Sequence, residues 1–433
     1  MIKTAVLLYF LAQTFFLINI QFPTKHNFDE FHYVPSAKQF LQLKENQNWE
    51  HPPLGKLIMA VGIAAWGDRP IGWRFMSTVF GALTWVGMYF LGLLLFESEE
   101  AALWIALLTL ANQLLYVQAR IGMLDTFMFG FLIWAMVGYC ATWLPQFSRS
   151  QNRKFFAFSG LMFGLSMACK WFAVVPWIGC GLLIGVIRLC QFRKLRFANP
   201  QPLDWYQPKM WAGLRWYDFI LSLVVLPCFV YFCSFLPYLF ISNRVMTGGS
   251  YSVLDFFAVQ AKMWNGQLRV ISPHPYMSHW PDWPLLRRPI WYAFDKEGLR
   301  QESVRGVLLL GNPLIMWSGV VALLGCLWGG IFRRDRAGFF ICFFYALFYG
   351  CWLVIPRKIS FYYYYYPAGM MLSFALAYVF FRKEFGRLSA IPWLRWAFLG
   401  SACSLFIHFF PILAALKIPA DAFRRWMWFP SWI

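Results

Sequence analysis

Apolar stretches long enough to cross a membrane recur along the whole chain. A helix of about 20 residues spans the roughly 30 Å of hydrocarbon in a bilayer. Such runs fall at about 4–21, 71–96, 101–118, 121–144, 155–170, 172–190, 217–241, 304–331, 337–355, 362–381 and 394–416. We therefore expect an all-α polytopic membrane protein with about eleven transmembrane helices in a single integral domain, residues 1–433. The division within 155–190 is the least regular, and a re-entrant arrangement there is an alternative.

The composition indicates the same class of protein. Hydrophobic residues make up 60% of the 433 positions and charged residues only 13%, whereas soluble domains are about 25% charged. The ten cysteines lie in or beside apolar runs and form no CxxC pair, so we expect neither a disulfide framework nor a zinc site. The first run lacks a small-residue cleavage site, which favours a first span over a signal peptide.

The distribution of basic residues predicts the orientation of the spans. A net charge of +19 would suggest nucleic-acid binding in a soluble protein, but no hydrophilic domain remains here to carry it. Basic residues gather at about 149–154, 188–215, 333–336 and 382–395. Eleven spans place these segments on one side, which the positive-inside rule assigns to the cytoplasm. The polar segments at about 22–70 and 242–303 and the C-terminal tail then face outward, so we expect the chemistry on the outer face.

The first outer segment begins with two adjacent acids, Asp29 and Glu30. A carboxylate at the membrane surface can accept a proton from a hydroxyl nucleophile. A solvated pair that caps a helix is the alternative interpretation. On a helix the two side chains diverge by about 100°, so we expect only one, Asp29, to act as the base.

The motif HPPLGK at residues 51–56 follows in the same segment. Its prolines break a preceding helix and favour the start of the next one. Residues 57–66 are apolar but too few to span, so they should form an amphipathic stretch at the interface. This would hold His51 and Lys56 at the depth of lipid phosphates, although a simple turn with a snorkelling lysine gives the same pattern.

Several ionisable residues lie in or beside apolar runs, where charges are expensive and usually paired or functional. They are Arg74, Arg120, Asp125, Lys170, Arg357 and Lys358. A salt bridge between Arg120 and Asp125, five residues apart, is one interpretation. Lys170 and Arg357 have no acid nearby in the sequence, which favours an anionic ligand.

The second outer segment carries a loop rich in Pro, Trp and His at residues 272–284. Its candidates for stacking on a sugar ring are His274, Tyr276, Trp280 and Trp283, with an interfacial aromatic belt as the alternative. Five of the six histidines lie in the two outer segments, but their spacing matches no compact ligand set. We therefore expect no metal site.

Taken together and in order, these motifs resemble the protein O-mannosyltransferase family, glycosyltransferase family 39 of the GT-C membrane class. The resemblance runs from about residue 22 to 370. It is carried by Asp29-Glu30, the HPPLGK motif, Arg120 with Asp125, Lys170-Trp171, the 274–284 loop, Gly311-Asn312-Pro313 and the run from Arg357 to Pro367.

The resemblance implies a GT-C fold and inverting transfer of mannose from a polyprenyl-phosphate carrier to Ser or Thr hydroxyls of secreted proteins. Asp29 and Glu30 match the acidic pair associated with catalysis, and Arg74, Asp125 and Lys358 would support the site. The candidates for the carrier phosphate are His51, Lys56, Arg120, Lys170 and Arg357. The second outer segment is too short for the MIR domain of eukaryotic members, which indicates a bacterial-type member in the plasma membrane. No nucleotide-binding signature occurs, so the lipid-linked sugar is the expected donor and no cofactor is expected.

Other functions remain as alternatives. Residues 362–366 are five consecutive tyrosines, a departure from the family pattern that leaves the acceptor and the sugar open. The nearest alternative is a GT-C transferase that places aminoarabinose or another sugar on a lipid or glycan. A transporter usually shows internal symmetry, which this sequence lacks. An inactive scaffold would not need the acidic pair and the embedded cations.

Overall fold

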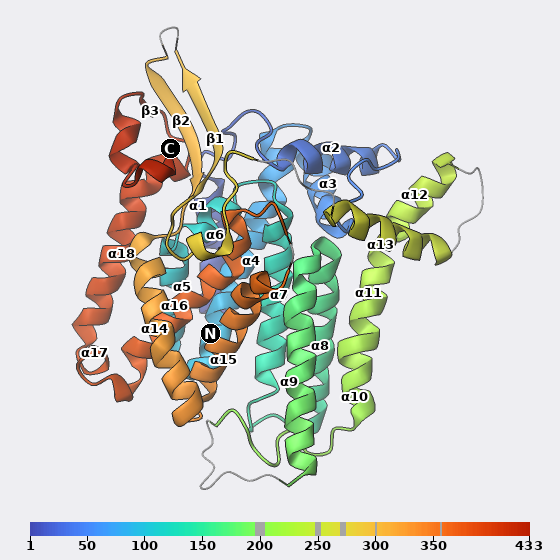
Figure 1. The fold of residues 1–433 in the computed structure, drawn as a ribbon, viewed down its shortest axis with the longest axis vertical. Helices are drawn as coiled ribbons and strands as arrows, with labels where there is room; N and C mark the ends of the chain where they lie inside the picture. The colour runs from blue at the N-terminus through green and yellow to red at the C-terminus, as the bar shows by residue number, and fades with distance from the viewer. Residues whose placement is uncertain (195–203, 247–252, 269–273, 299–300, 356) are drawn as a thin grey trace.

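The computed structural model describes residues 1–194, 204–246, 253–268, 274–298, 301–355 and 357–433. Long helices run side by side along the longest axis of the molecule, and short helices and a small sheet gather at one end (Figure 1). The basic segment expected at 188–215 is described except for residues 195–203. In the aromatic loop, Ser272 and Pro273 lie outside the described residues.

Each expected apolar run contains helix, which confirms a helical membrane protein. The long bundle consists of α1 (Ile2–Leu17), α4 (Pro70–Phe96), α5 (Glu99–Ala111), α6 (Leu114–Gln118), α7 (Leu124–Ala141), α8 (Arg149–Cys169), α9 (Val174–Phe192), α10 (Trp216–Ile220), α11 (Leu226–Ser234), α14 (Pro313–Phe332), α15 (Arg336–Tyr345), α16 (Tyr366–Phe381), α17 (Arg387–Ala390) and α18 (Pro392–Leu413). The helix that follows α11, α12 (Leu236–Met246), turns away from the bundle (Figure 1). Among the described residues, seven helical segments are long and apolar enough to cross a bilayer.

The breaks between helices have local causes. The run at 101–118 divides into α5 and α6 at Gln113, whose φ of 75° is incompatible with a continuing right-handed helix. The expected division within 155–190 falls at Lys170, which has extended backbone angles between α8 and α9. Figure 1 shows α8 and α9 as two separate long helices, so the expected division of this stretch into two helices is correct.

One expected span begins too early. Residues 304–312 do not continue α14, because β2 (Ser303–Leu309) pairs with β1 (Ile290–Glu297) as an antiparallel hairpin and with the short β3 (Ile418–Pro419). Run length alone does not distinguish a buried strand from a helix. The helix starts only at Pro313, where Asn312 caps it by accepting a hydrogen bond from the Leu314 amide.

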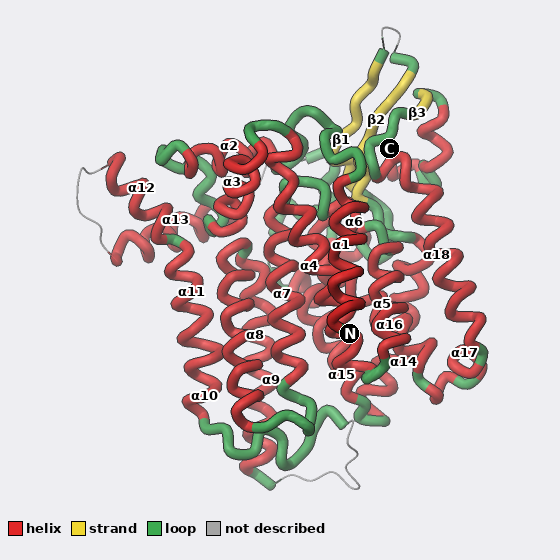
Figure 2. Tube along the Cα trace, turned by 180° about the vertical axis from the view of Figure 1, so that it is seen from behind, coloured by secondary structure: helices red, strands yellow, loops and turns green. Residues whose placement is uncertain are grey.

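Three further helices lie at the same end as the sheet: α2 (Glu30–Leu41), α3 (Leu54–Trp66) and α13 (Val253–Leu268). The C-terminus lies there too, while residues 204–215, which precede α10, lie at the opposite end (Figures 1 and 2). Ion pairs at that opposite end join Arg153 to Asp218 and Arg334 to Asp204. The acidic pair and the described basic segments around 149–154, 204–215 and 333–336 therefore lie at opposite ends of the bundle.

The core lies around α7 and α16. These helices are buried on nearly every face, so their sequences show little amphipathic pattern. Outer helices instead leave large apolar side chains uncovered, for example Leu182 on α9 and Phe229 on α11. Exposed apolar surface of this kind suits contact with lipid tails.

Candidate active site

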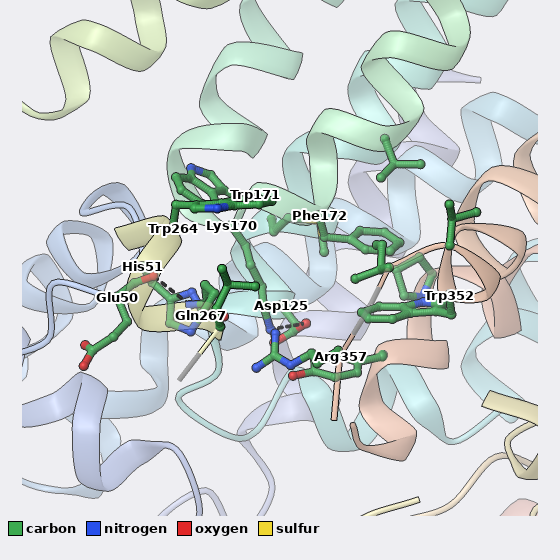
Figure 3. Close-up of a pocket in the computed structure, with 17 residues that line it drawn as sticks. Glu50, His51, Asp125, Lys170, Trp171, Phe172, Trp264, Gln267, Trp352 and Arg357 are labelled. Atoms are coloured by element: carbon green, nitrogen blue, oxygen red, sulfur yellow. Dashed lines mark hydrogen bonds and ion pairs between the residues drawn. The ribbon is translucent and has the colours of Figure 1, made fainter. Parts of the chain in front are cut away.

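A cavity of about 360 Å³ opens at the end of the bundle that carries α2, α3 and α13 (Figure 3). Its ionisable and amide side chains are Glu50, His51, Asp125, Lys170, Gln267 and Arg357. The remaining lining is mostly aromatic and aliphatic, and includes Trp171, Trp264 and Trp352. Five segments that are far apart in the sequence thus place charged or polar groups around one apolar space.

Lys170 and Asp125 form a buried ion pair on the cavity wall. The Lys170 ammonium donates to both carboxylate oxygens of Asp125, at 2.9 and 2.7 Å. It also lies 4.9 Å from the ring centroid of Tyr363 and 5.3 Å from that of Tyr364. Asp125 pairs with Lys170 and not with Arg120, because the break after α8 brings Lys170 to the first turn of α7.

Arg357 presents a second cation to the cavity (Figure 3). Its Nε donates to the Ile359 carbonyl at 2.9 Å, and its guanidinium lies 5.0 Å from the ring centroid of Tyr364. Within the described residues it forms no ion pair with a carboxylate. Its remaining N–H groups can therefore bind an anion, and a guanidinium matches phosphate geometry well. The adjacent Lys358 is exposed.

His51 also lines the cavity, but as a neutral group. Burial lowers the pKa of His51 well below its usual range, and the charges of Lys170, Lys56 and Arg357 lower it further. The ring of Tyr33 packs edge-on against it at 5.9 Å. A neutral imidazole can offer one N–H to a ligand oxygen and does not add positive charge.

Lys56 lies behind this wall and is only 1% exposed. Its ammonium donates to the His51 carbonyl at 2.9 Å and also to the Asn48 carbonyl. Burial lowers the pKa of Lys56 to about 7. The structure therefore places Lys56 under the 48–51 loop, where it holds His51 in position.

Arg120 is not part of the cavity. Its guanidinium donates to the backbone carbonyls of Phe16, Ile18 and Leu413, at 3.3, 2.7 and 3.1 Å. These carbonyls lie at the C-terminal ends of α1 and α18, where a cation is favoured. Of the five expected phosphate-binding residues, the structure brings His51, Lys170 and Arg357 to the cavity lining and leaves Lys56 and Arg120 outside it.

The two adjacent acids have different surroundings. Glu30 is fully buried and accepts two hydrogen bonds from Arg74, at 2.7 and 2.8 Å. It also accepts the amide N–H groups of Asn27 and Gly122, at 3.0 and 2.8 Å. Glu30 and Arg74 therefore tie the start of α2 to the segment between α6 and α7, and no lone pair of this carboxylate faces open space.

Asp29 occupies the N-cap position of α2, but its side chain does not cap the helix. It is half-buried and accepts a hydrogen bond from the Tyr33 hydroxyl at 3.1 Å. Burial raises the pKa of Asp29, whereas the nearby charge of Lys170 lowers it. Its electrostatic partners Lys170 and Asp125 both line the cavity, so Asp29 lies beside that space with a carboxylate that remains available for proton transfer.

The aromatic loop packs around this site more than it lines the cavity. His274 lies against Phe28 and Phe361, at 5.4 and 5.2 Å between ring centroids. Trp283 is buried, and its indole contacts Trp352 edge-on at 5.5 Å. Trp352 in turn stacks on Tyr364 at 4.6 Å, so the loop supports two aromatic walls of the cavity.

The other two aromatic residues of this loop make different contacts. The Trp280 carbonyl accepts a hydrogen bond from the Tyr349 hydroxyl at 3.1 Å. The ring of Tyr276 lies 5.7 Å from the Arg288 guanidinium.

Sequence reasoning missed two contributors to the site. The first is α13, whose residues were expected to form a loop. This helix places Trp264 and Gln267 in the lining of the cavity, and the Gln267 amide donates a hydrogen bond to the Glu50 carbonyl at 2.9 Å. Its apolar residues repeat at helical spacing, which is the signal that could have revealed it. The second is Tyr33, which lies one helical turn after Asp29 and could have been noticed for that spacing.

Comparisons with known proteins agree on one family. The family model described as the C-terminal four TMM region of protein-O-mannosyltransferase matches residues 252–432. The model described as dolichyl-phosphate-mannose-protein mannosyltransferase matches residues 50–194. A polyprenol-phosphate-mannose--protein mannosyltransferase of Mycolicibacterium smegmatis is 26% identical, over 99% of this chain and 92% of the relative. Its counterpart from Corynebacterium glutamicum is 25% identical, over 94% and 88%.

Solved structures show the same fold. The S. cerevisiae protein O-mannosyltransferase Pmt1-Pmt2 complex bound to the sugar donor superposes with a TM-score of 0.81 at 14% identity, over 99% of this chain and 93% of that one. ArnT from Cupriavidus metallidurans bound to undecaprenyl phosphate gives a TM-score of 0.57 at 13% identity, over 96% and 76%. The expected GT-C architecture is therefore confirmed.

Proposed function

The chain belongs to the protein O-mannosyltransferase family, and we propose that it transfers mannose from a polyprenyl-phosphate carrier to Ser or Thr hydroxyls of proteins. The observation that carries this proposal is the position of Asp29 beside a cavity whose cations include Lys170 and Arg357. This arrangement supplies the two things the reaction needs, a base for the acceptor and positive charge for the leaving phosphate.

The cations act on the donor. When the bond between the anomeric carbon and the phosphate oxygen breaks, the carrier leaves as a phosphate anion. Lys170 and Arg357 stabilise the charge that develops on that oxygen, and the apolar lining strengthens their effect by excluding water. His51 contributes a neutral N–H. A leaving group stabilised in this way needs no general acid, and the proposed mechanism uses no cofactor.

The carboxylate acts on the acceptor. Asp29 takes the proton from a Ser or Thr hydroxyl as the oxygen forms its bond to the anomeric carbon, opposite the departing phosphate. One displacement of this kind inverts the anomeric configuration. Tyr33 orients Asp29 through its hydrogen bond, and Glu30 with Arg74 holds the start of α2. His274 and Tyr276 lie on the loop that packs against Phe28, next to Asp29, which favours contact with the acceptor.

The site faces outward in this proposal, from the plasma membrane of a bacterium. The described basic segments lie at the end opposite the cavity, and the positive-inside rule assigns them to the cytoplasm. In a variant free of native cysteines, Lys44→Cys on the cavity side should react with a membrane-impermeant maleimide added outside intact cells. Lys194→Cys at the other end should react only after permeabilisation. The reverse labelling would contradict this orientation.

The direct test of the activity uses purified protein, polyprenyl-phosphate-mannose and a peptide that contains Ser and Thr. The proposal predicts mannose on the peptide hydroxyls and release of polyprenyl phosphate. Transfer of another sugar, or of mannose to lipid and not to peptide, would favour the alternative GT-C reaction.

Arg357→Gln should weaken binding of the donor. A hydrogen-bonded charge contact contributes about 1.5–3 kcal/mol, so the affinity for polyprenyl phosphate should fall about 10- to 150-fold. The matched control is Lys44→Gln, which removes the same charge from an exposed position at the same end of the molecule. Equal affinities for the wild type and Arg357→Gln would remove Arg357 from the phosphate site.

A further inference from the structure

A second groove lies beside the first turns of α14. It has a volume of about 600 Å³ and is bounded by the loop at 284–287, the part of α14 from Trp317 to Val321, and residues 429–431. It shares no lining residue with the cavity of the candidate active site. The mechanism described above therefore does not use it.

Two walls of this groove are tied together by hydrogen bonds. The Trp432 indole donates to the Leu286 carbonyl at 2.6 Å, and the Trp291 indole donates to the Trp432 carbonyl at 2.8 Å. The Arg288 guanidinium donates to the Ser431 carbonyl at 2.7 Å. These bonds fix the C-terminal residues against the loop, so the groove is a built feature of the fold.

The open side of the groove is apolar and continues along a helix that can cross the membrane. Val321 is 66% exposed and Leu285 is 49% exposed. Exposed apolar side chains continue from Val321 at helical spacing through Leu324, Trp328 and Ile331, and α14 is long and apolar enough to span a bilayer. An apolar face of this kind lies against lipid tails, so a hydrocarbon chain that runs along α14 fits the groove.

A cation lies at the rim of the same groove. Arg287 lines it, and 66% of the Arg287 side chain is exposed. Its guanidinium donates to the Asp282 carboxylate at 3.3 Å and to no other group in the described part of the chain, so further N–H groups can bind an anion. A guanidinium matches the geometry of a phosphate, and basic side chains at a membrane surface attract lipid phosphates. The rim and the walls together complement a phosphate joined to a hydrocarbon chain.

We propose that this groove binds a phospholipid from the leaflet at this end of the bundle, with one acyl chain along α14 and the phosphate on Arg287. A water-soluble anion would leave the apolar walls uncovered, and a hydrocarbon without a headgroup would leave the guanidinium unused. The site does not depend on the proposed transfer reaction, because it lies apart from the cavity that contains Lys170 and Arg357.

The test measures binding of phosphatidylglycerol to the detergent-solubilised protein by native mass spectrometry. Arg287→Gln should weaken binding about 3- to 10-fold, as expected for loss of a charged hydrogen bond at an exposed position. Val321→Trp should weaken it more than about 10-fold, because the indole fills the space of the acyl chain. Diacylglycerol with the same chains lacks the phosphate, so Arg287→Gln should leave its affinity unchanged.

Matched controls exist in the same protein. Arg424→Gln and Leu324→Trp make the same changes at exposed positions outside the groove and should leave the affinity for phosphatidylglycerol unchanged. The groove variants also alter exposed side chains, so their thermal unfolding midpoints without lipid should match that of the wild type.

Two results would overturn the proposal. One is equal affinity for phosphatidylglycerol in the wild type, Arg287→Gln and Val321→Trp. The other is a wild-type dimer that dissociates in Val321→Trp while lipid binding stays the same, which would assign the groove to a second copy of the chain.

Discussion

Asp29→Asn should lower the rate of mannose transfer about 10²- to 10⁴-fold, the usual effect of losing a general base. The substitution keeps the shape of the side chain, and asparagine can still accept the hydrogen bond from Tyr33. The affinity for polyprenyl-phosphate-mannose should stay near that of the wild type, because the proposed phosphate contacts, Lys170 and Arg357, are unchanged. Single-turnover rates and equilibrium binding of the donor, measured on the same preparations, separate the two effects.

Two controls accompany this prediction. Asp295→Asn removes the same charge from an exposed position on β1 and should leave the rate unchanged. The wild-type rate should fall as the pH drops through the pKa of Asp29, because only the carboxylate accepts a proton. Since burial raises that pKa, the decline should begin above the range of an ordinary aspartate, and Asp29→Asn should lack it. Near-normal turnover of Asp29→Asn would exclude Asp29 as the base.

Glu30→Gln should mainly destabilise the protein. It leaves the fully buried Arg74 guanidinium without its counter-charge, and loss of one partner from a buried ion pair typically costs about 3–5 kcal/mol. A clear fall in the thermal unfolding midpoint of the detergent-solubilised protein should follow. The double variant Glu30→Gln/Arg74→Met should recover part of the loss, because no unpaired charge remains. A Glu30→Gln protein that is as stable as the wild type but inactive would instead give Glu30 the catalytic role.

The motifs along the chain predicted which segments carry polar functional groups, because each motif consists of residues that are adjacent or nearly adjacent in the sequence. The acidic pair after the first span, the HPPLGK motif and the embedded lysine at 170 all lie at the site end of the bundle. Helical membrane architecture could likewise be read from run length, since a bilayer imposes a fixed span. The start of α14 could not, because the apolar run through β2 continues into it and only Pro313 marks the boundary.

Partners in three dimensions were harder to predict. Arg120 and Asp125 are close in sequence, yet they do not pair. Arg120 donates hydrogen bonds to carbonyls at helix ends, and Asp125 forms an ion pair with Lys170, which is 45 positions away. The roles of the adjacent acids also depend on distant residues. Arg74 and Gly122 donate hydrogen bonds to Glu30, whereas the Asp29 carboxylate accepts one from Tyr33 and no other within the described part of the chain. Pairwise spacing does not contain this information, since it arises from how the helices pack.

The decisive experiment determines the anomeric configuration of the mannose that the purified protein attaches to a Ser or Thr peptide and compares it with that of the donor. In the proposed mechanism one carboxylate is the base and a cation-lined cavity binds the leaving phosphate, so a single displacement should give a product with inverted configuration. A product that retains the donor configuration would contradict this mechanism, because a single displacement opposite the departing phosphate inverts the anomeric carbon.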